Sequence, residues 1–393
     1  MKLVPINIRI FYLVNFLAGF VFWYATEKLF MKTIGISDFG IAVNAVVFLV
    51  VILLFDVPSG VLADKWNRKY TLMLSMAALA VSSFVLGMSH NLSMYVVGTA
   101  LFGGYVVLSS GTFQAMMYDC LAENELEKQY DRFQGRAYGL FLTGIGISSL
   151  AGGYIASYAG LRQTFFYSIV PPVLAILILS GIHEPVFHKQ TSDSKFWTHI
   201  RQSARVVSSQ PVIFHLALFL VIGNMLRSTQ NEFGGLYYIG LSLSTISMGY
   251  VNAGKWISGA VGQFIAPIVG REKAIALTPW FFISFAAFSV IMHLPSLIFF
   301  FFASALFSLV ANQVEAAVQE QVSSNIRATT LSLFSFCTNI IMVPLSLVFG
   351  WVAQNSTVFR GYQLFAVIGL GYALFWTVKS RYVIIHKLNR LAT

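Results

Sequence analysis

The sequence predicts an all-α membrane protein with twelve transmembrane helices in two pseudo-symmetric six-helix bundles. Of its 393 residues, 57% are hydrophobic and only 10% are charged, whereas a soluble domain has roughly 25% charged residues. Twelve apolar stretches reach the roughly 20 residues that a helix needs to cross a bilayer. They cover 8–30, 39–63, 70–89, 93–117, 135–158, 163–182, 211–234, 245–268, 273–292, 295–318, 328–353 and 361–382. Most are too long for barrel strands, and lipid leaves helices as the remaining choice.

Positive charge is unevenly distributed along the chain. There are 25 Lys and Arg against 15 Asp and Glu, a formal net charge of +10. With both termini in the cytoplasm, most of these cations lie in cytoplasmic loops and helix ends, as the positive-inside rule requires. The exceptions are Lys28, Lys32, Arg162 and Arg360 on the outer side, and Arg227 and Lys255 within helices. Topology in a bacterial inner membrane therefore explains the basic balance, and we expect no nucleic-acid partner.

The beginning of the chain resembles a signal peptide, because Lys2 and Arg9 precede an apolar run. No small-residue cleavage site follows, so we expect a retained first helix over 8–30. The two cysteines, Cys120 and Cys337, lie in different halves, without the spacing of a disulfide framework or a metal site. We expect no metal and no cofactor.

The most polar long segment, 183–210, divides the chain into a bundle over 1–182 and a bundle over 211–393. This cytoplasmic linker has cations at 195, 201 and 205, with Phe196, Trp197 and Ile200 between them. That spacing fits a short amphipathic helix on the membrane surface, and a plain solvated linker fits equally well.

The two halves repeat weakly. Glycine-led turns that run into basic residues begin at Gly60 and Gly262, and similar helix starts follow at Arg136 and Arg327. Asp119 and Glu315 are the acids near the ends of the fourth and tenth predicted helices. Each of these pairs is separated by about half the chain, and duplicated halves are typical of transporters with a binding site between them.

One loop carries a recognisable motif. Between the second and third predicted helices the chain has Gly60, Leu62, Ala63, Asp64, Lys65, Arg68, Lys69 and Leu72. This pattern resembles the signature loop of the major facilitator superfamily, and twelve helices in two halves are similar to that family over essentially the whole chain. The loop departs from the pattern at Asn67, where the family has glycine. Because asparagine tolerates left-handed backbone, we expect the turn to be kept.

The resemblance implies a gate on the cytoplasmic side. In the family the acid of the loop docks near the start of the eleventh helix, here near Arg327, and its arginine pairs with an acid that ends the fourth helix. The gating residues predicted in this way are Gly60, Asp64, Arg68, Lys69, Asp119 and Arg136. Alternatively, the basic residues of the loop only anchor the topology.

Ionisable groups inside membrane helices are costly, so they are candidates for a functional site. Arg227 and Lys255 are the clearest cases, and both share a helix face with nearby amides. The predicted substrate pathway consists of Asn224, Arg227, Asn231, Asn252, Lys255 and Asn312. Two buried cations suit an anionic or zwitterionic substrate, unless Glu232 or Glu315 neutralises them.

Three acids are candidates for proton coupling: Glu27, Asp56 and Glu315. Each has a simpler interpretation. Glu27 and its neighbour Lys28 lie near the outer surface, where long side chains reach water. Asp56 fits the gate described above, and Glu315 fits the counterpart of Asp119.

The sequence thus favours a secondary active transporter that moves a small solute by alternating access, with proton-coupled efflux of drugs or metabolites as the first hypothesis. Uptake by a symporter or uniporter is the second, and a membrane sensor without flux is an alternative from another class. The seven histidines are scattered without a clustered catalytic set, and no phosphate-binding glycine loop occurs, so we expect neither an enzyme nor ATP drive. By resemblance we expect a monomer.

Overall fold

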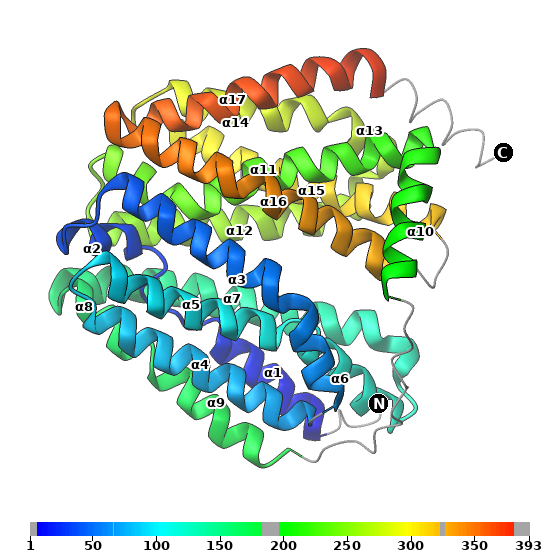
Figure 1. Ribbon diagram of the computed structural model, residues 1–393, viewed down its shortest axis with the longest axis horizontal. Helices are drawn as coiled ribbons and strands as arrows, with labels where there is room; N and C mark the ends of the chain where they lie inside the picture. Colours follow the sequence, from blue (N-terminus) through cyan, green and yellow to red (C-terminus); the bar gives the residue numbers. More distant parts are fainter. Residues whose placement is uncertain (1–5, 66, 183–195, 323–326, 381–393) are drawn as a thin grey trace. The chain divides into compact units, whose positions relative to one another are not determined.

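The protein is described by a computed structural model that covers residues 6–65, 67–182, 196–322 and 327–380 (Figure 1). Only the backbone is described at 57, 60–65, 128, 131, 196–200, 327, 328 and 380. All regular secondary structure in these ranges is helical. Ten segments there are long and apolar enough to cross a membrane. The other two predicted stretches correspond to α1 (Ile6–Ala18) with α2 (Glu27–Thr33), and to α12 (Thr245–Val269), so the predicted all-α class is confirmed.

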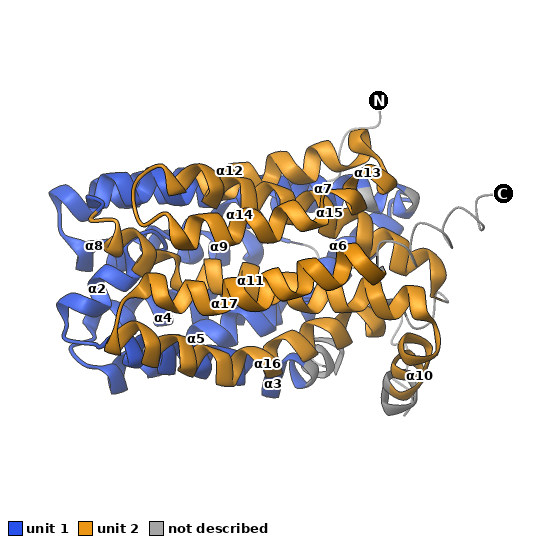
Figure 2. Ribbon diagram, turned by 90° about the horizontal axis from the view of Figure 1, so that it is seen from above, with its two compact units in different colours: residues 1–190, 243–253 blue, residues 191–242, 254–393 orange. Residues whose placement is uncertain are grey.

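The chain forms two compact units, coloured separately in Figure 2. Unit 1 consists of residues 1–190 and 243–253, so it includes the beginning of α12. Its other helices are α3 (Asp38–Lys65), α4 (Arg68–Met88), α5 (Leu92–Ser109), α6 (Thr112–Ala122), α7 (Tyr130–Tyr158), α8 (Leu161–Tyr167) and α9 (Val170–Ser180), with a 3₁₀ turn at Glu127–Gln129. Within this unit α5 packs against α3 and α4, and α1 packs against α7 and α9.

Unit 2 consists of residues 191–242 and 254–393. Its helices besides the later part of α12 are α10 (Phe196–Ser209), α11 (Pro211–Gly240), α13 (Arg271–Ala276), α14 (Thr278–Val290), α15 (Ser296–Gln321), α16 (Arg327–Asn355) and α17 (Val358–Phe375), followed by a π-helical turn at Trp376–Ser380. Fully buried aromatic rings, among them Phe219, Phe233 and Phe282, fill its core between α11, α14 and their neighbours. The predicted boundaries at 182 and 211 stay a prediction.

The prediction of one continuous helix over 8–30 was wrong. The helix ends at Ala18, and α2 begins only at Glu27. The cause is tertiary: Gly19 lies so close to α7 that a Cβ there would be 2.4 Å from the carbonyl oxygen of Phe141. Serine side chains bind backbone groups of the break, since Ser148 donates to the carbonyl of Gly19 and Ser168 accepts from the amide of Phe22, both at 2.9 Å. In lipid such partners are what makes a break tolerable.

The segment after the predicted first half is helical from Phe196 to Ser209, which favours the helical alternative for the linker. This helix, α10, contacts α11 and α16. Its Ser203 is buried and accepts a hydrogen bond of 3.2 Å from Thr330, while Arg201 and Arg205 are exposed. Its predicted place on the membrane surface stays a prediction.

Candidate functional site

The motif loop ends in a capped helix rather than in a left-handed turn. Asn67 has an extended backbone, with φ −158°, and its side chain accepts a 3.0 Å hydrogen bond from the amide of Tyr70. Asparagine at this position therefore satisfies one of the free amides that begin α4. The expectation of a left-handed residue at Asn67 was wrong, because the side chain does here what a glycine cannot.

Arg68, the first residue of α4, forms an ion pair with Asp119 near the end of α6. The side chains are 13% and 26% exposed, so the pair is partly shielded from water and its charges interact more strongly than surface charges do. The structure thus brings together two of the predicted gating residues. The side chains of Gly60 and Asp64, and the docking of Asp64 near Arg327, lie outside the described part of the chain.

The other two predicted gating residues do not join this pair through any contact described. The ammonium group of Lys69 donates to the carbonyls of Ser180 and Ile182, at 2.7 and 3.0 Å, and so binds the carboxyl end of α9. A cation is favourable there because the last carbonyls of a helix carry partial negative charge. Arg136 is exposed on α7.

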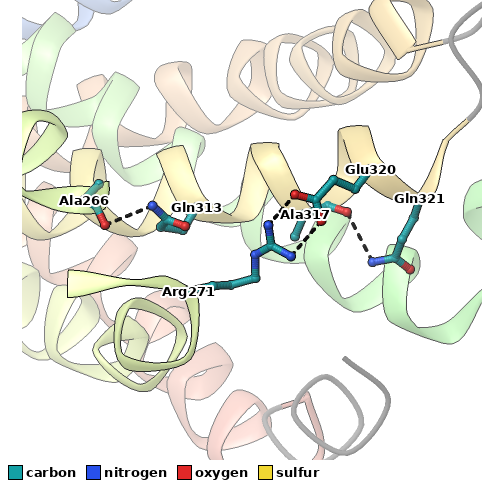
Figure 3. A network of polar contacts seen from close by, with 6 residues as sticks. All are labelled: Ala266, Arg271, Gln313, Ala317, Glu320 and Gln321. Carbon is teal, nitrogen blue, oxygen red and sulfur yellow. Dashed lines mark hydrogen bonds and ion pairs between the residues drawn. The ribbon is translucent and has the colours of Figure 1, made fainter. Parts of the chain in front are cut away.

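A second arginine–carboxylate pair occupies the equivalent place in unit 2 (Figure 3). Arg271, the first residue of α13, binds Glu320 of α15 through two hydrogen bonds of 2.7 and 2.5 Å. Gln313 of the same helix donates to the carbonyl of Ala266 at 2.9 Å. The expected counterpart of Asp119 was Glu315, and that was wrong. The signal for Glu320 was present: Arg271 follows Arg68, and Glu320 follows Asp119, by about the same 200 residues.

Arg227 and Lys255, the two cations of the predicted pathway, both lie over aromatic rings of unit 2. The guanidinium of Arg227 lies 5.3 Å from the ring centre of Phe307, and the ammonium of Lys255 lies 4.8 Å from that of Trp256. Lys255 is only 5% exposed. Neither cation has a hydrogen bond or ion pair from its side-chain nitrogens to any residue that the structure describes.

The amides of the pathway differ in what they contact. The side chain of Asn224 donates to the carbonyl of Leu220 at 2.7 Å, one turn earlier in α11. Asn231 is exposed and Asn312 is half-buried. The amide of Asn252 is buried and donates to the hydroxyl of Ser149 at 2.8 Å, so it links α12 to α7 within unit 1. Because the side-chain amide of Asn252 already donates to Ser149, this hydrogen-bond donor is occupied and less available to a substrate.

The acids considered for proton coupling have different surroundings. Glu27 accepts from Lys28 at 2.8 Å and from the hydroxyl of buried Tyr95 at 3.1 Å. Lys28 is buried, so the simpler interpretation of a side chain that reaches water was wrong for it. Asp56 and Glu315 are exposed. Among the described residues, no group of His, Cys, Asp and Glu has the arrangement to hold a metal ion.

Comparisons with known proteins point to one family. A family model described as Major Facilitator Superfamily matches residues 10–346. An efflux pump, mokI, of Monascus pilosus is 28% identical over 55% of this chain and 38% of its own length. An uncharacterised MFS-type transporter, MJ1317, of Methanocaldococcus jannaschii is 29% identical over 32% of this chain and 30% of its own. The chain therefore spans less than half the length of these curated relatives.

Solved structures show the fold. A crystal structure of the nucleoside transporter NupG has a TM-score of 0.76 at 14% identity, covering 96% of this chain and 99% of that one. A D-xylose-proton symporter has a TM-score of 0.75 at 14% identity, covering 94% and 96%. At such identities the likeness concerns the fold alone.

Proposed function

The chain belongs to the Major Facilitator Superfamily, and from that premise we propose that it is a secondary active transporter that moves a small solute by alternating access. The fold is that of a multi-pass membrane protein, and ten of the described segments are long and apolar enough to cross a membrane. We propose twelve such helices in two six-helix bundles. Rocking of such bundles around a central site is the mechanism that this architecture supports. We place the protein in the bacterial inner membrane, as a monomer with both termini in the cytoplasm.

The observation that carries this proposal is the repeated arginine–carboxylate pair. Arg68 with Asp119, and Arg271 with Glu320, each join the start of one helix to the end of another within their own unit. A contact of this kind has two states, made or broken, and a transporter needs such elements to change conformation reversibly. Asp64 and Gly60 complete the proposed gate of unit 1, and we assign Lys69 a supporting role through α9.

Proton coupling is the second part of the proposal. A proton carrier must release and rebind its proton during the cycle, and Glu315 is the best candidate for this role. It is exposed, it has no ion pair among the described residues, and it lies on α15, eight residues after the Phe307 ring that holds Arg227. Glu27 already binds Lys28 and Tyr95, so proton binding there would disrupt existing contacts. The solved symporter named above is proton-coupled by its title.

Efflux of drugs or metabolites is the direction that we propose first. It is supported by the relative named as an efflux pump. Uptake by symport is supported by the solved D-xylose-proton symporter, and it remains the second candidate.

The experiment is a proton-flux measurement in proteoliposomes that hold the purified protein, a pH-sensitive dye and an imposed pH gradient. Tetraphenylphosphonium, phenylalanine, xylose and benzoate are added in turn, and empty liposomes are the control. We expect one class of solute to dissipate the gradient, and Glu315→Gln to abolish that response. Flux of a solute without proton movement would contradict coupling, and binding without any flux would identify a sensor instead.

A further inference from the structure

Arg227 and Lys255 are two cations of unit 2 that aromatic rings hold in place. A ring face attracts a cation electrostatically without taking any of its N–H donors. The five donors of the guanidinium and the three of the ammonium are therefore left for another partner. Within the part of the chain that the structure describes, no such partner exists for either group.

This arrangement is costly unless something completes it. Charged side chains inside a membrane protein are normally paired with one another or with backbone carbonyls. Here both residues contact α15: the guanidinium of Arg227 lies over Phe307, and the backbone carbonyl of Lys255 accepts a 2.9 Å hydrogen bond from Ser304, one turn earlier on that helix. Only 5% of Lys255 is exposed. An oxyanion is the chemical group that can accept from both a guanidinium and an ammonium.

The surrounding acids limit the charge of that oxyanion. Glu232 lies on α11, five residues after Arg227, and Glu315 lies on α15, eight residues after the Phe307 ring that holds Arg227. With both acids ionised, the four groups sum to zero, and a doubly charged ligand is repelled by two carboxylates. Protonation of Glu315, the proposed proton carrier, leaves a net charge of +1, which a single carboxylate balances.

We propose that Arg227 and Lys255 form an oxyanion-binding half-site in unit 2 that receives the carboxylate of a small monoanionic solute. The guanidinium presents the parallel donors that suit a carboxylate, and the ammonium adds a charge-assisted hydrogen bond. This assignment rests on the proposed transport function, because it names the class of solute that the same pathway takes.

The test is isothermal titration calorimetry on the full-length protein in detergent, with five ligands that share a phenyl ring and differ in charge. These are benzoate, phenyl phosphate, phenylalanine, benzylamine and benzyl alcohol. We expect benzoate to bind at least about 10-fold more tightly than each of the others, since a charge-assisted pair contributes about one to two factors of ten. Equal or tighter binding of benzylamine, benzyl alcohol, phenyl phosphate or phenylalanine overturns the assignment.

Variants show whether the named residues carry the binding. Arg227→Gln and Lys255→Gln are each expected to weaken benzoate binding by about 10- to 100-fold. Arg227→Lys keeps the positive charge and loses the parallel donors of the guanidinium. It should bind benzoate more tightly than Arg227→Gln does, which would show that the weak binding of the Gln variant is not a folding defect. Arg360→Gln, an exposed arginine of the same unit, is the matched control and should change the affinity less than twofold. Benzoate binding that survives both Gln variants overturns the assignment.

Flux separates this inference from the transport proposal. If benzoate does not bind while another solute crosses the proteoliposome membrane, the half-site is wrong and transport stands. If benzoate binds through Arg227 and Lys255 but no solute crosses, the half-site stands and transport is contradicted.

Discussion

The two junctions that begin α4 and α13 share a plan and differ in chemistry. In each, an arginine opens the helix and pairs with an acid near the end of another helix of its unit. In unit 1 the preceding residue is Asn67, which is extended and caps α4 with its side chain. In unit 2 it is Gly270, with φ 79° and ψ 163°, a conformation that favours glycine.

The pairs also differ in exposure. Arg68 and Asp119 are 13% and 26% exposed, whereas Arg271 and Glu320 are 31% and 59% exposed. Water screens the second pair more, and exposed ion pairs contribute little to stability. The two ion pairs thus share a geometry, and the pair in unit 2 is the weaker one, so we expect the junction of unit 1 to dominate the transport cycle.

The largest expected effect is that of Asp119→Asn. It leaves the partly buried guanidinium of Arg68 without its carboxylate, at a cost of about 1.5 to 3 kcal/mol. Each 1.4 kcal/mol changes an equilibrium constant by a factor of ten. The equilibrium between the conformations of the transporter should therefore shift by about tenfold or more, and the initial flux in proteoliposomes should fall by a similar factor. Glu320→Gln is the matched control from unit 2. Equal losses of flux in Asp119→Asn and Glu320→Gln would contradict the proposed dominance of the junction in unit 1.

The next largest effect is expected from exchanging the residues that precede Arg68 and Arg271. Gly270→Asn places a side chain at φ 79°, where there is open space but the backbone is strained, so we expect a loss of about 1 to 3 kcal/mol. Asn67→Gly should cost only a few tenths of a kcal/mol, since glycine is a tolerable N-cap. Thermal unfolding in detergent measures both. A larger loss at Asn67 would contradict the conformations described here.

Removal of the exposed pair should have a smaller effect. Arg271→Gln is expected to lower the free energy of unfolding by less than about 1 kcal/mol, and raised salt should shrink the difference from wild type. Unfolding curves at low and high ionic strength check this. A loss of several kcal/mol in the free energy of unfolding that does not depend on salt would mean that the Arg271–Glu320 pair is shielded from water, contrary to this account.

The smallest expected effect is that of Lys69→Met, which keeps an unbranched side chain of nearly the same length and removes its charge. The carbonyls of Ser180 and Ile182 lose a donor at the end of α9, and we expect a cost of about 0.3 to 1 kcal/mol. Flux should change less than in Asp119→Asn. A flux loss as large as that of Asp119→Asn would make Lys69 a gate residue in its own right.

Sequence reasoning reached the helical fold, because lipid makes apolar helices a local property of composition. It reached the Arg68–Asp119 pair through the resemblance of the loop around these residues to a family motif. It missed the break after Ala18, since the cause is the close approach of α7 to Gly19 and nothing in the local pattern reveals that contact. It named only Glu315, because the predicted stretch 295–318 ends before Glu320, and the geometry of Arg271 identifies Glu320 as the partner.

The same limit applies to the candidate site. The sequence identified Arg227 and Lys255 as costly charges, but the rings of Phe307 and Trp256 that hold them became visible only in three dimensions. Asn252 looked equivalent to Lys255 in the pattern, and its bond to Ser149 shows that neighbouring positions on one helix face can have different roles.

The most direct test of the central claim is charge reversal of the pair in unit 1, measured as initial flux of the solute that collapses the pH gradient. Arg68→Asp and Asp119→Arg place like charges together, and each should reduce flux by about tenfold or more. The double variant restores opposite charges, and we predict that it recovers at least several-fold over either single variant. Single variants with wild-type flux, or a double variant no better than the worse single one, would contradict a working role for this ion pair.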